Sequence, residues 1–165
     1  MHNHEPEDYS CPFCALVRGM DDGYYNSTTS DIIHQDESIT AFVGSLQREK
    51  NVGNVLIIPN QHFENIYDLP EELAIQLHKA TRLMAIVLKD IYSCDGTSIR
   101  QHNEPAGGQE IWHYHIHVTP RYKGDEFYTY YKSRRAFMPP EERTGHALRL
   151  RERLNKICDP WNTKP

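Results

Sequence analysis

The sequence predicts an α+β fold with an antiparallel sheet, one long helix, a short N-terminal helix and a C-terminal helix. Short β-branched runs lie before and after a single long stretch of helical periodicity, and this order is typical of the class. The 165 residues are enough to bury one core. We therefore expect a flexible N-terminal tail over residues 1–10 and a single domain over residues 11–165.

The N-terminal half carries the signals of one short helix and three strands. A short helix is expected from Cys11 to about Met20. Two apolar runs joined by a tight polar turn predict a pair of strands, and a β-branched run that ends at a proline predicts a third. These strands are expected over residues 31–35, 39–43 and 55–58. The residues between the second and the third are expected to form a polar connection.

The long helix and the elements after it follow from similar signals. Pro70 and two glutamates are typical of a helix start, and apolar residues then recur at helical spacing as far as Ile91. A strand over residues 98–102 and a glycine-rich turn lead to a second strand rich in histidine. The C-terminal helix is expected over about residues 140–157, where proline and two glutamates again mark the start.

The histidine-rich strand, residues 112–119, is the most informative segment of the chain. Side chains alternate between the two faces of a strand, so His113, His115 and His117 are expected on one face and apolar side chains on the other. Imidazole can act as nucleophile, proton carrier or metal ligand near neutral pH. Three imidazoles on one face therefore predict chemistry rather than packing.

Composition and the first residues exclude several classes of protein. The net charge is −5 with histidines neutral, which argues against a general nucleic-acid binder. No apolar run approaches the ~20 residues that span a bilayer, so we expect no membrane association. The first residues have neither the basic nor the apolar region of a signal peptide. We therefore expect a cytoplasmic protein.

Cys11 and Cys14 form a CxxC motif, which in a cytosolic chain is either redox-active or metal-binding. A thioredoxin-like motif follows a strand, and nothing similar to a strand precedes Cys11. Zinc takes four nitrogen or sulfur ligands in a tetrahedron, and His62 and His113 are two further candidates. From the residues alone, zinc, a redox pair and two unligated thiols all stay open.

Residues 103–118 strongly resemble the histidine triad (HIT) superfamily. The signature of that superfamily is three histidines at alternate positions, preceded by an asparagine and a Gly-Gln pair, and all of them match here. The resemblance extends to residues 56–62, an apolar strand ending in Pro-x-x-His, to Pro120-Arg121 and to the CxxC segment. It covers most of residues 11–125 and leaves the C-terminal forty residues outside.

The resemblance implies an α+β homodimer that acts as a nucleotide hydrolase or nucleotidyl transferase at an α-phosphate. It places His115 as the nucleophile and His117 at the phosphate and leaving group. It places Gly108 and Gln109 in the loop that meets the phosphates. Our own hypothesis is that Gln109 orients the leaving-group oxygen or the attacking water. Asn103 lies near the ribose and phosphate, and Phe42 lines the base pocket. In the zinc-containing branch, Cys11, Cys14, His62 and His113 are the ligands of a structural Zn²⁺.

Two positions depart from the family pattern. Gly44 stands where many members carry an aspartate that contacts the ribose, and Glu110 stands where many carry a serine or threonine that donates to a phosphate. A carboxylate at position 110 repels a phosphate unless it turns away or is protonated.

We expect a nucleotidyl-histidine on His115, formed from dinucleoside polyphosphates or nucleoside phosphoramidates. One alternative is a nucleotide-binding sensor with little turnover, and another is a metalloenzyme that uses the alternating histidines as ligands.

Overall fold

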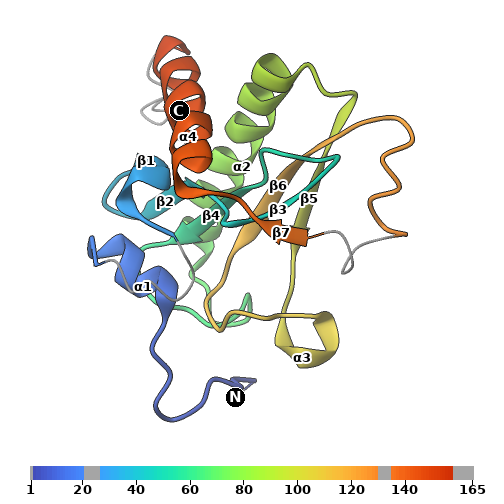
Figure 1. The fold of residues 1–165 in the computed structure, drawn as a ribbon. Coiled ribbons are helices and arrows are strands. Elements are labelled where there is room, and N and C mark those ends of the chain that lie inside the picture. Colours follow the sequence, from blue (N-terminus) through green and yellow to red (C-terminus); the bar gives the residue numbers. More distant parts are fainter. Residues whose placement is uncertain (1, 21–26, 130–134, 158–165) are drawn as a thin grey trace.

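The computed structural model describes residues 2–20, 27–129 and 135–157, and its core is a five-stranded antiparallel sheet in the order β1-β2-β4-β6-β5 (Figure 1). The strands of this sheet are β1 (Ile32–Gln35), β2 (Ile39–Val43), β4 (Val55–Pro59), β5 (Gly96–Gln101) and β6 (Ile116–Arg121). A second sheet pairs β3 (Leu46–Arg48) with β7 (Arg135–Phe137). The helices are α1 (Pro12–Val17), α2 (Glu71–Tyr92), α3 (Glu104–Gly107) and α4 (Pro140–Lys156), and a 3₁₀ turn covers Thr29–Asp31. The predicted fold class is confirmed.

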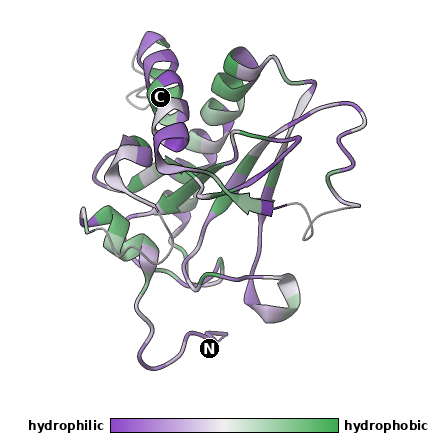
Figure 2. Cartoon of the chain, in the orientation of Figure 1, coloured by the Kyte–Doolittle hydropathy of each residue, from purple (hydrophilic) through white to green (hydrophobic). Residues whose placement is uncertain are grey.

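Alternation of side chains divides the large sheet into two different faces. Helices α2 and α4 cover one face, where Ala41, Ile57 and Val118 lie in the main core with them (Figure 1). On the opposite face Phe42 and Leu56 pack in a smaller cluster with Phe13 of α1. Figure 2 shows that the central strands are largely hydrophobic, whereas the visible surface of α4 is largely hydrophilic. Both faces of the central strands are therefore buried, and the triad histidines share the face that carries α1.

The histidine-rich strand begins later than the sequence predicts. β6 starts at Ile116 rather than at residue 112. The preceding backbone is bonded elsewhere, because the N–H of Tyr114 donates to Phe63 O at 2.6 Å instead of to a neighbouring strand. The predicted alternation still holds: Tyr114 and Ile116 belong to the core under α2, and His113 and His115 lie on the other side of the chain.

Other elements differ from the prediction in detail. The connection expected between the second and third strands contains β3, which pairs with β7, a strand that the sequence did not predict. Both strands are only three residues long, and polar side chains conceal their pattern. The predicted glycine-rich turn is the short helix α3. The long helix ends at Tyr92, where Ser93 takes a left-handed conformation with φ of 49°.

The N-terminal segment, predicted as a flexible tail, lies along the loop that follows β4. The backbone N–H of His4 and of Glu5 donate to the carboxylate of Glu64 at 2.6 and 3.1 Å. The His4 ring lies 3.0 Å from a carboxylate oxygen of Glu104. These contacts place the segment beside α3 (Figure 1). Over the residues described, no helix has the length and apolar character needed to cross a membrane.

A buried ion pair connects α4 to the 3₁₀ turn that precedes β1. The Arg143 guanidinium donates to Asp31 at 3.0 Å and to the carbonyl oxygen of Met138 at 2.7 Å, and both charged side chains are almost completely buried.

Replacing Arg143 with methionine leaves the Asp31 carboxylate buried without this partner, which costs about 3–5 kcal/mol. We expect urea unfolding to show a loss of that size. The exposed Arg82→Met on α2 is the control, and an equal effect in both variants would contradict this role.

Candidate active site and metal centre

A cavity of about 380 Å³ opens on the sheet face that carries α1. Phe13, Phe42 and Leu56 form an apolar wall, and His115 and His117 lie among the polar residues of the lining. The loop around α3 contributes Gly107 and Gly108, and β3, β5 and β7 contribute Arg48, Arg100 and Arg135. The predicted nucleophile, its neighbour in the triad and the predicted base-pocket residue therefore meet in one cavity.

His115 is held as the tautomer that a nucleophile requires. Its Nδ1 lies 2.7 Å from the carbonyl oxygen of His113. A carbonyl oxygen can only accept, so Nδ1 carries the proton and donates it. The lone pair of His115 is then on Nε2.

His117 is held as the complementary tautomer. The hydroxyl of Thr119 donates to Asn54 Oδ1 at 2.7 Å, which turns the amide nitrogen of Asn54 toward His117. That nitrogen lies 3.4 Å from His117 Nδ1, which therefore accepts, and the ring proton is on Nε2. The two rings are 5.0 Å apart between centroids. One neutral imidazole thus offers a lone pair and its neighbour a proton.

Burial keeps both imidazoles neutral at neutral pH. It lowers the pKa of His115 to about 4, against a smaller opposite effect of the hydrogen bond to the His113 carbonyl. The pKa of His117 also falls well below its usual value, first because of burial and then because His115 and Arg100 disfavour a further positive charge.

Asn103 and Gln109 do not line the cavity. Their side chains make hydrogen bonds that stabilise the loop around α3. The amide of Gln109 donates to the carbonyl oxygens of Glu64 and Ile111 at 2.6 and 3.0 Å and accepts from the backbone N–H of Glu104 at 2.8 Å. Asn103 accepts from the N–H of Ile66 and exchanges hydrogen bonds with Gln101. The loop that these amides hold includes Gly108, whose φ of 85° favours glycine.

Glu110 turns toward a cation. Its two carboxylate oxygens accept from the Arg135 guanidinium at 2.8 and 3.2 Å. This pairing joins the loop that follows α3 to β7 and balances the negative charge of Glu110.

Gly44 is packed closely by two residues of the site. A Cβ at this position would lie 2.4 Å from Leu56 Cδ1 and 3.1 Å from the amide nitrogen of Asn54. An aspartate here would therefore displace Leu56 and press on the amide that orients His117.

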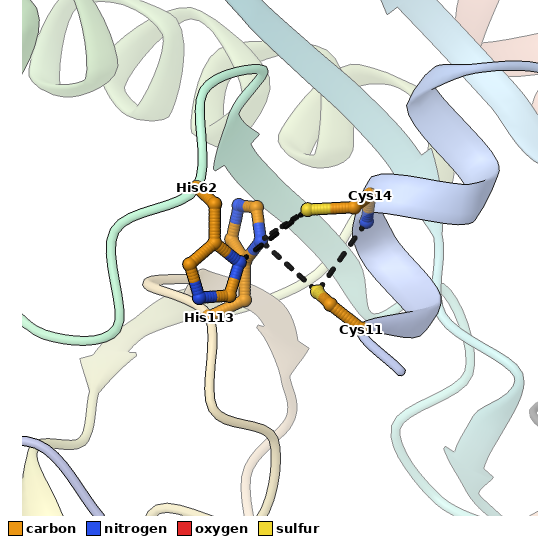
Figure 3. Close-up of side chains that lie close together, drawn as sticks. All are labelled: Cys11, Cys14, His62 and His113. Carbon is orange, nitrogen blue, oxygen red and sulfur yellow. Dashed lines mark hydrogen bonds between the residues drawn. The ribbon is translucent and has the colours of Figure 1, made fainter. Parts of the chain in front are cut away.

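Cys11, Cys14, His62 and His113 gather at the edge of this site, with their four ligand atoms all within 4.8 Å of one another (Figure 3). Cys11 Sγ lies 3.3 Å from His113 Nδ1, and Cys14 Sγ lies 3.3 Å from His62 Nδ1 and 3.6 Å from His113 Nδ1. A tetrahedral zinc with ordinary bond lengths separates sulfur and nitrogen ligands by about 3.5 Å. The four residues therefore fit a closed zinc site.

The Nε2 atoms of both histidines, which would not bind the metal, lie beside hydrogen-bond acceptors, as is usual for metal-binding histidines. His113 Nε2 lies 2.9 Å from the carbonyl oxygen of Pro59, and His62 Nε2 lies 3.0 Å from a carboxylate oxygen of Glu5. Such acceptors fix the tautomer that leaves Nδ1 for the metal. The hydrogen bond from Cys11, followed by those from the two histidines, lowers the pKa of the Cys14 thiol. Sequence reasoning did not identify Glu5, because it lies in the segment expected to be loose.

Comparison with known proteins agrees with this geometry. The family model of the HIT domain matches residues 26–124. The "Protein hit" of Bacillus subtilis is 32% identical over 146 residues, which cover 88% of this chain and 94% of that protein. The chain belongs to the HIT family.

Solved HIT structures share the fold. A zinc-bound histidine triad family protein from Mycobacterium smegmatis has a TM-score of 0.71 at 26% identity, over 90% of this chain and 95% of that one. A hypothetical histidine triad nucleotide-binding protein from Sulfolobus tokodaii has a TM-score of 0.72 at 25% identity, over 89% and 93% of the two chains.

Several residues of this HIT site carry no recognisable sequence signal. Arg48 lies in a segment expected to be a connection, and Arg100 lies in a strand whose faces the sequence alone did not assign. Asn54 precedes the third predicted strand. The positions of Arg48, Arg100 and Asn54 depend on contacts with Phe127 and His117, which are far away in the sequence.

Proposed function

We propose that this HIT protein is a nucleotide hydrolase or nucleotidyl transferase that forms a covalent nucleotidyl-histidine on His115. The observation that carries the proposal is the pair of opposite tautomers in one cavity, with a lone pair on His115 Nε2 and a proton on His117 Nε2. The nucleotide-binding description of the Sulfolobus tokodaii relative gives further support.

In the first step His115 Nε2 attacks the α-phosphorus, and a P–N bond forms while the bond to the leaving group breaks. The leaving atom keeps the electron pair: a phosphate departs as its anion, and an amine takes up a proton from solvent water. Positive charge develops on the imidazole, where the carbonyl oxygen of His113 accepts from Nδ1 and stabilises it. His117 Nε2–H donates to a non-bridging phosphate oxygen, on which negative charge accumulates.

In the second step water, or another acceptor, attacks the phosphorus and the P–N bond breaks. The electron pair of that bond returns to His115 Nε2, which leaves the ring neutral, and the attacking water gives up a proton to solvent. The backbone around Gly108 approaches the phosphates without interference from a side chain at that position. Asn103 and Gln109 support this loop through their hydrogen bonds to neighbouring backbone and side-chain groups, and a direct role of Gln109 toward water or leaving group stays a prediction. Phe42 forms part of the wall for the base.

Cys11, Cys14, His62 and His113 would hold a structural Zn²⁺, which supplies cross-linking of the N-terminal segment to the sheet and no open coordination position. His113 then has two tasks, since its ring faces the cysteines and its carbonyl oxygen orients His115.

The proposal is tested by incubation with adenosine 5′-phosphoramidate and with diadenosine triphosphate. We expect release of AMP and an intact mass increased by one adenylyl group. Nucleotide binding with neither AMP nor adduct would instead support the nucleotide-binding sensor. Activity that needs an exchangeable metal would support the metalloenzyme.

A homodimer completes the proposal, with β5 as the pairing strand. In the described part of the sheet β5 is an edge strand, and edges pair readily with a second copy. Ile99 on β5 is 52% exposed, and Ile86 on α2 lines the same surface groove.

Replacing Ile99 with lysine is therefore expected to convert the dimer to a monomer, because the charge would be buried at the centre of the interface. Light scattering coupled to size-exclusion chromatography measures the mass. Leu148→Lys, at an exposed leucine of α4, is the control that should remain dimeric. A monomeric wild type, or a dimeric Ile99→Lys, would contradict this pairing.

A further inference from the structure

A row of four side chains crosses the sheet beneath the cavity and changes character along its length. Phe42 pairs with Leu56, Leu56 with His117, and His117 with Arg100, on four neighbouring strands. Directly paired residues of antiparallel strands point to the same face. The row is therefore apolar at Phe42 and Leu56 and cationic at Arg100, and His117 lies between these two parts.

Arg48 extends the cationic end of this row. Its guanidinium carbon lies 4.5 Å from the centroid of the Phe127 ring, and that of Arg100 lies 4.7 Å from the same centroid. Contacts of this kind hold planar guanidinium groups in place. Both arginines line the cavity. Their positive charges also help to lower the pKa of His117, so both are near enough to act electrostatically on a group bound there.

The charge of the cavity contrasts with that of the whole chain. Three arginines and one glutamate line it, although the net charge of the protein is −5. The glutamate, Glu110, is paired with Arg135. Arg48 and Arg100 therefore add a positive potential at the end of the cavity that lies away from the apolar wall.

We propose that Arg48 and Arg100 select donors whose leaving group is itself an anionic phosphate. The inference rests on the proposed function, in which the nucleoside lies against the apolar wall and the α-phosphate at the two histidines. The leaving group, on the far side of the α-phosphate, then extends toward the arginines. When a phosphoanhydride breaks, the leaving phosphate gains negative charge, and two fixed guanidinium groups stabilise that charge. A neutral amine gains nothing comparable.

The test compares two donors that share the adenylyl group and differ in the leaving group. Adenosine 5′-phosphoramidate releases ammonia, and diadenosine triphosphate releases ADP. Arg48→Met and Arg100→Met keep a long side chain against Phe127 and remove the charge. We expect each to lower the ratio of kcat/KM for diadenosine triphosphate over phosphoramidate by about 10- to 100-fold. Arg48→Lys and Arg100→Lys should restore part of the ratio.

Arg149→Met, at an exposed arginine on α4, makes the same change of charge outside the cavity and should leave the ratio unaltered. If Arg48→Met and Arg100→Met lower kcat/KM equally for both donors, the arginines do not distinguish the leaving groups, and the inference is wrong. An unchanged ratio has the same meaning.

A binding measurement separates failure of this inference from failure of the proposed function. If the wild type transfers adenylate from neither donor, the proposed function fails. Calorimetric affinities for ADP and AMP still test the arginines, because the two ligands differ by one phosphate. A preference for ADP that disappears in Arg48→Met and Arg100→Met supports the site. A preference that persists, or is absent from the wild type, overturns it.

Discussion

Replacing His115 with alanine is expected to lower the release of AMP by at least about 10³-fold and to abolish the adenylyl adduct. His115 lies closer to His117 than the other cavity imidazole with a carbonyl oxygen at Nδ1: the ring centroids of His115 and His117 are 5.0 Å apart, whereas His102, whose Nδ1 lies 2.8 Å from the carbonyl oxygen of Gly107, is 6.3 Å from His117. Loss of the nucleophile removes the covalent route entirely, whereas loss of a hydrogen-bond donor would only slow it. Quantified AMP and intact mass, from the same quenched samples, measure both effects.

Two controls make this result specific. His78→Ala removes an exposed histidine of α2, outside the cavity, and should retain full turnover. Unfolding of His115→Ala in urea should show a stable fold, because the ring lies against Phe13 at the cavity and its Nδ1 donates to the backbone carbonyl of His113 rather than to a ligand atom of the Cys11, Cys14, His62 and His113 group. Adduct formation in His115→Ala would reject the mechanism. An active enzyme without any adduct in the wild type would indicate direct attack by water.

Local patterns in the sequence determine much of this fold. Alternation predicts the triad histidines on one face and Tyr114 and Ile116 on the other, and the structure has this arrangement although β6 starts late. Proline and acidic residues predict the starts of α2 and α4. These signals succeed because they depend on neighbouring residues, whose preferences a single sequence contains.

The parts that the sequence does not predict depend on contacts between distant residues. Arg48 and Arg100 reach the same ring, Phe127, from different strands. Glu110 conflicts with a phosphate site when taken alone, and only the position of Arg135 on β7 shows how its charge is balanced. Asn54 acquires its importance from His117, 63 positions along the chain. Such pairings follow from topology, which no local pattern encodes.

Replacing Cys14 with serine is expected to remove zinc and to destabilise the whole domain. Wild-type protein purified without chelator should contain close to one zinc per chain by metal analysis. Cys14 Sγ lies within 3.6 Å of both ligand histidines, so its loss opens the cluster at the centre. Binding of a structural metal contributes directly to folding free energy. We expect a loss of at least about 4 kcal/mol, or roughly 10 °C in the melting temperature.

Cys94→Ser provides the matched control, since Cys94 is buried against α2 and is not a member of the cluster. It should retain zinc whatever its own effect on stability. Zinc loss in Cys14→Ser should also reduce turnover, because the cluster holds the ring of His113 while the carbonyl oxygen of the same residue orients His115. A wild type without zinc and with two reactive thiols would reject the metal site. Full zinc occupancy in Cys14→Ser would remove Cys14 from the ligand set.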